Sequence, residues 1–362
     1  MRFAAALLFA ALALPTSAQV FKAKEALTVP GTTTNGVAVR PDGKVFLVIA
    51  RQPGQNVPQI AEFEQGKLIP YPSAAWNSYK AGDDASQKFV HANALRFDTE
   101  GVLWVVDAGA EDIGKPYVKG GPKLVSIDTH TGKVKRVLAL DDDSLKPTSY
   151  IDDVRFNDDH AYITDAGAPG LIAMHTPDGS FRRVLDGDPS TTAQRPVRAA
   201  GKQLSTAEGK PLMVHADQLE VSPDGSKLYY QPLCGPMSVI ETQYLDEIDL
   251  SEAERHTHVQ HFADTPCTGG TAIDASGNIY VTDVDGQQIL RYTPMGVPTT
   301  LTQDKRIIWG DALWLSADGK LWIPDAQNSL SAGMNGGKNE QHLPGKVYTL
   351  EIGAKPPIND HR

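Results

Sequence analysis

The stretch NALRFDTEGVLWVVD, residues 93–107, has the form that decides the fold: an alternating apolar strand, a turn closed by Gly101, and a second strand. Five other stretches align with it on the corresponding turn residue: Gly43, Asp159, Gly225, Gly277 and Gly319. Period-two alternation, β-branched and aromatic residues, and a glycine-containing turn are signals of a β-hairpin. The chain therefore repeats one hairpin six times.

Two further strands follow most of these hairpins, as in QIAEFEQGKLIPY (59–71) and KLVSIDTHTGKVKRVLAL (123–140). Six four-stranded sheets of this regularity predict an all-β, six-bladed β-propeller, in which ring closure protects the strand edges. After the sixth hairpin only KVYTLEI (346–352) remains, one strand short of a blade. We therefore expect VFKAKEALTV (20–29) to supply the missing strand and close the ring.

Two segments interrupt the repeat without forming a domain of their own. Residues 186–211 are polar and rich in turn formers, and residues 244–256 can carry a short helix. We expect both on the surface. A single propeller domain is thus predicted over residues 19–362.

Residues 1–18 have the pattern of a cleaved signal peptide. One early cation precedes an apolar run that is too short to span a bilayer, and Thr16 and Ala18 are small residues before the expected cut. The alternative is a retained membrane anchor, but the run ends in Pro15 and small polar residues. We expect a periplasmic or secreted protein.

Charge and cysteine content restrict the partners. Acidic residues outnumber basic ones 44 to 34, and no long basic stretch is present, which argues against a nucleic-acid or anionic-membrane partner. We expect a monomer that binds a neutral or cationic small molecule, with no organic cofactor.

The two cysteines, Cys234 and Cys267, are expected to form a disulfide in an oxidising compartment. A reactive or metal-binding thiol is the alternative.

A polar residue opens the innermost strand of almost every repeat. These positions are Asn35, Asn93, Asp152, Asp217, Gly269 and Asp311. In a propeller the start of this strand borders the central channel, so the side chains should converge on one axis. Gathered carboxylates need a cation, a proton or a donor between them. We predict a divalent-cation site at Asn93, Asp152 and Asp217, with calcium as the candidate, and ligand contacts from Asn35 and Asp311. The alternative is that each side chain caps its own strand or pairs with a neighbouring blade.

Two residues earlier in each repeat stands a second, chemically varied set: Thr33, His91, Tyr150, His215, Cys267 and Trp309. Imidazole, phenol and indole groups beside carboxylates can orient a ligand and move protons. We predict proton transfer by His91 or His215, and ligand contacts from Tyr150 and Trp309. A histidine that is only hydrogen-bonded in the rim is the competing interpretation.

A third set, six residues after the turn, is interpreted as structural. Asp107 and Asp165 each precede Ala-Gly, a sequence in which the aspartate side chain bonds to backbone amides two residues on. Signatures of other enzyme classes are missing: the chain has no G-x-S-x-G, HExxH, Walker loop or dinucleotide fingerprint.

Several blocks, in order and spacing, resemble those of the major royal jelly protein and yellow family in a bacterial-type member. They include RFDTEGVLWVVDAG (96–109), LEVSPDGSKLYYQPL (219–233) and GGTAIDASGNIYVTDVDGQQILRY (269–292). The resemblance implies a secreted six-bladed propeller, in a family that includes dopachrome-converting, amine-binding and nutritive proteins. Thr99 and Glu100 stand where insect members usually have a cysteine, so the insect disulfide pattern does not transfer.

The chain is more distantly similar to SMP-30 and gluconolactonase propellers, whose channel metal is held by carboxylate and Asn side chains. Asn93, Asp152 and Asp217 match that set, whereas Asn35 stands where a Glu would be expected. Three hypotheses follow: an isomerase or tautomerase acting on a cyclic or phenolic substrate, a metal-dependent lactonase or esterase, and a non-catalytic carrier or scaffold.

Overall fold

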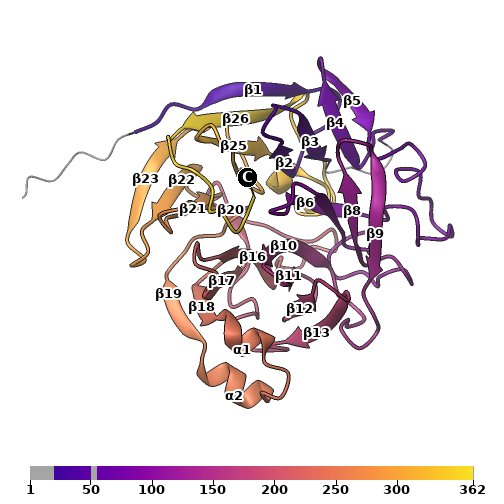
Figure 1. The fold of residues 1–362 in the computed structure, drawn as a ribbon. Helices are drawn as coiled ribbons and strands as arrows, with labels where there is room; N and C mark the ends of the chain where they lie inside the picture. The colour runs from indigo at the N-terminus through magenta and orange to yellow at the C-terminus, as the bar shows by residue number, and fades with distance from the viewer. Residues whose placement is uncertain (1–19, 50–54, 362) are drawn as a thin grey trace, which may run out of the picture.

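The computed structural model describes residues 20–49 and 55–361, and it is a six-bladed β-propeller (Figure 1). The predicted signal peptide, residues 1–18, lies outside the described residues. No helix in the described part of the chain is both long enough and apolar enough to cross a bilayer.

Each blade is an antiparallel sheet of four strands, and we number the blades along the chain. Blade 1 consists of β2 (Gly36–Val39), β3 (Val45–Val48), β4 (Ile60–Glu64) and β5 (Lys67–Pro70). Blade 2 consists of β6 (Ala92–Phe97), β7 (Leu103–Asp107), β8 (Lys123–Asp128) and β9 (Lys133–Ala139). Blade 3 consists of β10 (Ile151–Asn157), β11 (His160–Asp165), β12 (Leu171–His175) and β13 (Ser180–Val184).

Blade 4 consists of β16 (Ala216–Val221), β17 (Lys227–Pro232), β18 (Met237–Glu241) and β19 (Gln260–Ala263). Blade 5 consists of β20 (Thr271–Ile273), β21 (Ile279–Asp283), β22 (Gln288–Tyr292) and β23 (Pro298–Gln303). Blade 6 contains β24 (Trp314–Leu315), β25 (Lys320–Asp325) and β26 (Gly345–Glu351), and its fourth strand is β1 (Lys24–Val29). A short helical turn, η1 (Asn328–Leu330), follows β25.

The N-terminal strand closes the ring, as predicted. β1 pairs antiparallel with β26, from Lys24 opposite Thr349 to Val29 opposite Gly345. The two ends of the propeller are therefore joined by backbone hydrogen bonds within one sheet, in which β1 is the outermost strand of blade 6.

The first strands of the six blades surround the axis, and each contacts the first strands of the two neighbouring blades. Apolar side chains of these strands fill the space between blades. Leu95 and Phe97 of β6, for example, belong to one buried cluster with Phe46 of β3. This packing explains the alternating apolar pattern on which the repeats align.

The two inserted segments have different surroundings. Residues 244–256 include parts of two short helices, α1 (Thr242–Asp246) and α2 (Glu252–Thr257), as the sequence suggested. Residues 186–211 are not merely a surface loop, because they contain a small sheet of β14 (Arg198–Ala199) and β15 (Lys202–Gln203). Val197, Ala199 and Leu204 of this segment are buried in one cluster with the disulfide and Trp309. Composition alone did not reveal these buried contacts.

Aspartates at the end of the second strand hold the loop that leads into the first strand. Asp107 accepts hydrogen bonds from the backbone N–H groups of Val90 (2.8 Å) and His91 (2.9 Å), and its Oδ2 lies 2.6 Å from Lys123 Nζ. Asp165 and Asp325 accept corresponding bonds from the N–H groups of Tyr150 and Trp309, each at 2.9 Å. These contacts show the structural role that the turn sequences indicated.

Replacing Asp107 with Ala should strongly destabilise the protein. The side chains of Asp107 and Lys123 are completely buried, so the variant leaves a buried ammonium group without its carboxylate. Loss of one partner from such a pair costs about 3–5 kcal/mol of unfolding free energy, which urea denaturation can measure. Asp42→Ala is the control, because Asp42 forms an ion pair on the surface and its removal should barely change the midpoint. Equal effects of the two substitutions would contradict the assigned role of Asp107.

Candidate functional site

A cavity of about 840 Å³ occupies one end of the central channel. Its polar lining includes Asn35, Asn93, Asp152, Asp217 and Asp311, which lie at or shortly before the start of the first strands of five blades. The ring thus brings together side chains that are almost 280 residues apart, as sixfold convergence requires.

The sixth position of this set is Gly269, and the structure explains the exception. A Cβ atom there would lie 2.3 Å from the carbonyl oxygen of Gly310 and 2.5 Å from Trp309 Nε1. Blade 5 therefore has no room for a side chain where blade 6 approaches it.

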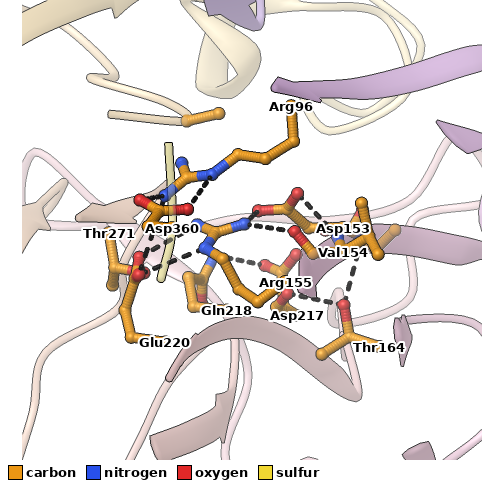
Figure 2. Close-up of polar contacts among 12 residues, drawn as sticks. Arg96, Asp153, Val154, Arg155, Thr164, Asp217, Gln218, Glu220, Thr271 and Asp360 are labelled. Carbon is orange, nitrogen blue, oxygen red and sulfur yellow. Dashed lines mark hydrogen bonds and ion pairs between the residues drawn. The ribbon is translucent and has the colours of Figure 1, made fainter. Parts of the chain in front are cut away.

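A chain of hydrogen bonds connects three blades across the cavity. The Tyr150 hydroxyl donates to Asn93 Oδ1 (3.0 Å), and Asn93 Nδ2 donates to Asp152 Oδ1 (2.5 Å). The carboxyl of Asp152 in turn bonds to that of Asp217. Gln218 Nε2 completes the arrangement by donating to Asp217 Oδ2 at 2.8 Å (Figure 2).

The carboxyl groups on the axis favour their protonated forms. Burial raises the pKa of Asp217 to about 6, and burial together with the charge of Asp217 raises the pKa of Asp152 well above its ordinary value. Because two adjacent buried carboxyl groups cannot both ionise without a cation, the pair favours retaining one proton. Burial and the charge of Asp217 also raise the pKa of Asp311 well above the ordinary range, although Asn328 Nδ2 donates to it at 2.8 Å.

The two predicted catalytic histidines have different positions. His91 lines the cavity, and its Nδ1 lies 2.9 Å from the carbonyl oxygen of Glu111. Since a carbonyl only accepts, Nδ1 donates this bond, and in the neutral form of the ring Nε2 carries the lone pair. His215 is not among the residues that line the cavity; its Nδ1 accepts from the N–H of Ala193 (3.1 Å) in the inserted segment. The structure therefore brings only one of the two histidines to the cavity.

Aromatic residues form part of the cavity wall. Tyr150 and Trp309 both line it, as the sequence suggested, and the rings of His91 and Tyr150 meet edge to face with centroids 5.6 Å apart. Trp309 is almost completely buried, and its Nε1 has no hydrogen-bond partner within the described ranges. The indole N–H is thus a buried, unpaired donor in the cavity wall.

Two amide oxygens beside the predicted metal set remain unpaired. Asn35 Oδ1 and Gln218 Oε1 are buried beside the cavity and lack a hydrogen-bond partner among residues 20–49 and 55–361. Together with Asn93, Asp152 and Asp217 they make an all-oxygen donor set, which suits a hard cation such as calcium. Within the described part of the chain, no group of three or more His, Cys, Asp or Glu side chains is placed to hold a metal. Amide oxygens would therefore have to complete any cation site.

The disulfide between Cys234 and Cys267 is formed and joins blade 4 to the loop before blade 5. Both cysteines are buried in the same cluster as Trp309 and Tyr150. The bond therefore supports the wall of the cavity and leaves no free thiol among the described residues.

The sequence analysis missed a set of charged residues deeper in the channel. Three residues after the predicted positions stand Arg96, Arg155 and Glu220, all buried. A β-bulge interrupts the pairing at Asn93 in blade 2, with similar irregularities in blades 3 and 4. Because side chains alternate between the two faces of a regular strand, the pattern places Arg96, three residues after Asn93, on the opposite face of the sheet. The recurring charge in NALRF, DDVRF and DQLEV was the available signal.

The fold and the cavity define a six-bladed β-propeller with an axial, acidic site. The model of the family "Major royal jelly protein" matches residues 90–304, and the chain belongs to this family. No curated protein sequence matches the chain significantly.

Among solved structures, the chain is similar to a calcium-binding regucalcin from Agrobacterium tumefaciens, with 15% identity, a TM-score of 0.56, and 95% of this chain and 99% of that chain covered. It is also similar to a gluconolactonase from Xanthomonas campestris, with 11% identity, a TM-score of 0.50, and coverage of 94% and 98%. A putative gluconolactonase gives 12% identity, a TM-score of 0.51, and coverage of 92% and 93%. At such identities the likeness shows the shared six-bladed fold.

Asp325 should make stability depend on pH. Burial raises its folded-state pKa to about 7, whereas an unfolded Asp titrates near ~3.9. The folded state therefore holds a proton that the unfolded state loses, so the stability contribution is complete below about pH 4 and disappears as pH rises to about 7. In Asp325→Asn an amide oxygen can still accept from the N–H groups of Ile308 and Trp309, but the side chain no longer titrates. The difference in unfolding free energy between variant and wild type should therefore grow as the pH rises across this range, on the order of a few kcal/mol. The unfolding free energies of both proteins can be measured by urea denaturation from pH 4 to 8. If they change in parallel with pH, the role assigned to Asp325 is wrong.

Proposed function

We propose that this propeller is an exported protein that binds a small cyclic or phenolic molecule in the axial cavity and catalyses proton transfer on it, as an isomerase or tautomerase. The observation that carries the proposal is the presence, in one cavity, of an imidazole whose Nδ1 is hydrogen-bonded to a carbonyl and of a buried carboxyl pair whose pKa values are raised by burial. Enolisation needs a base and an acid within reach of one substrate, and these groups supply both.

His91 is the base in this scheme. Its Nδ1–H bond to the carbonyl of Glu111 fixes the tautomer, so that Nε2 can take a proton from a carbon or hydroxyl group of the substrate. The proton shared by Asp152 and Asp217 goes to the substrate oxygen that gains charge. To form an isomer, His91 returns its proton to a different carbon of the enol, and the enol hydroxyl returns its proton to the carboxyl pair, which restores both groups.

The surroundings favour an aromatic or otherwise planar ligand without negative charge. Tyr150 and Trp309 offer ring surfaces, while Ile113, Leu233 and Met334 add apolar contacts. Acidic side chains outnumber the one lysine in the lining, Lys80, which disfavours an anion. Export is supported by the pattern of residues 1–18, and the disulfide fits an oxidising compartment.

The proton-transfer proposal predicts that His91→Gln lowers turnover by about 10²–10⁴-fold. Deuterium exchange into a panel of cyclic ketones, phenolic keto acids and quinone methides in D2O, followed by NMR, reads out enolisation directly. His215→Gln is the matched control and should stay within a few-fold of wild type, because His215 does not line the cavity. Exchange that responds equally to both substitutions would exclude His91 as the base, and binding without exchange would indicate a carrier.

A calcium-dependent lactonase or esterase is the second candidate, and the unpaired oxygens of Asn35 and Gln218 favour it. Asn93, Asp152 and Asp217 would hold the cation together with these amides, in place of the shared proton. A bound divalent cation would supply Lewis-acid activation of a carbonyl group. The likeness to a calcium-binding regucalcin agrees with this candidate through the fold alone.

Calcium binding makes a separate prediction. If the site exists, millimolar CaCl2 should raise the melting temperature of the wild-type protein after EDTA treatment, and MgCl2 should do so less because it demands a stricter geometry. Asp217→Asn removes a charged donor and should abolish the shift. Identical responses of wild type and variant, or none in either, would count against a cation at this position.

A further inference from the structure

The C-terminal segment, residues 355–361, turns back into the centre of the ring (Figure 1). It is fixed to several blades on the way. The carbonyl oxygen of Lys355 accepts from the N–H of Ala275 in blade 5 (2.8 Å), and Asn359 Nδ2 donates to the carbonyl oxygen of Ser222 in blade 4 (2.9 Å). Asp360 and His361 are buried at the end of this path.

Asp360 forms a two-point ion pair with Arg96, a residue 264 positions earlier in the chain (Figure 2). Arg96 Nε donates to Asp360 Oδ1 at 3.0 Å, and Nη2 donates to Oδ2. Both side chains are at most 10% exposed. Although burial opposes ionisation of Asp360, the charges of Arg96, His361 and Arg155 hold its pKa well below the usual range. Asp360 is therefore bound as a carboxylate.

The surrounding charges show why Arg96 needs a carboxylate from outside its own blade. Arg155 is already paired, with Glu220 at 2.9 and 3.1 Å and with Asp153 at 2.6 Å. Glu220 also accepts from the Thr271 hydroxyl (2.8 Å) and lies 4.0 Å from Arg96. Without Asp360, the buried guanidinium of Arg96 would be left with the carboxylate of Glu220, which lies 4.0 Å away and is already bound to Arg155.

Blade 6 completes the surroundings of Asp360. The imidazole of His361 stacks on Trp314, with centroids 3.7 Å apart, and its Nε2 donates to the carbonyl oxygen of Leu315 at 2.7 Å. Arg96 lies over the same indole, 5.3 Å from its centroid. A guanidinium with two aligned donors, placed on an aromatic face, is a typical arrangement for binding a carboxylate.

We propose that Arg96 and Trp314, with Arg155 beside them, form a carboxylate-binding site in the channel, and that the chain fills this site with its own Asp360. The site lies deeper than the cavity, because Arg96 and Arg155 each stand three residues further along the strand than a residue that lines it, and neither arginine is part of the lining. The bound tail closes the channel at this depth. This site is independent of the activity proposed for the cavity.

Chemical rescue of the full-length Asp360→Ala variant tests the proposal, because formate has the size of the carboxyl group that the substitution removes. We expect the variant to melt several degrees below wild type in sodium chloride. Sodium formate at equal ionic strength should restore at least half of this loss with a saturable dose dependence. Wild type should respond equally to both salts.

Two further variants separate a specific site from a general salt effect. Asp360→Asn fills the space with a neutral amide, so it should be destabilised but not rescued by formate. Arg96→Met combined with Asp360→Ala lacks the guanidinium and should show no formate response. If Asp360→Ala does not stay folded in chloride, its refolding yield from urea in formate against chloride is the readout. Equal behaviour in the two salts, or equal rescue of the double variant, would overturn the proposal.

Discussion

The hydrogen bonds that the strand-ending aspartates accept from backbone N–H groups are the interaction on which the cavity depends. Asp107, Asp165 and Asp325 each accept from the backbone N–H of the residue two positions before the channel set. In this way an aspartate in the second strand of a blade fixes the loop that carries His91, Tyr150 or Trp309. A propeller positions its cavity side chains on loops between strands, and loops need such fixed points because they lack a regular backbone ladder.

Electrostatics divide the channel into two layers. Near the cavity, burial raises the pKa values of Asp152, Asp217 and Asp311. A few residues deeper, two arginines are matched by ionised carboxylates, including the one contributed by the C-terminal segment. The first layer therefore stores a proton or receives a cation, whereas the second is fully paired and closes the channel.

The architecture and much of the candidate site could be read from the repeat. Aligning six hairpins placed Asn93, Asp152 and Asp217 at equivalent positions, and equivalent positions in a closed ring must meet at the axis. The same alignment overlooked Arg96 and its neighbours, because a bulge interrupts the alternation that period-two patterning assumes. It also did not distinguish His91 from His215, since the inserted segment that bonds to His215 is not part of the repeat.

The sequence by itself determined the number of blades, the strand that closes the ring and the disulfide partners. These features follow from the local periodicity of each repeat and from the number of repeats and cysteines in the chain. Only the tertiary structure decided which side chains share a proton, which histidine reaches the cavity, and that Asp360 binds Arg96 across 264 positions of chain. Such contacts depend on distances between segments remote in the sequence, and no local pattern encodes them.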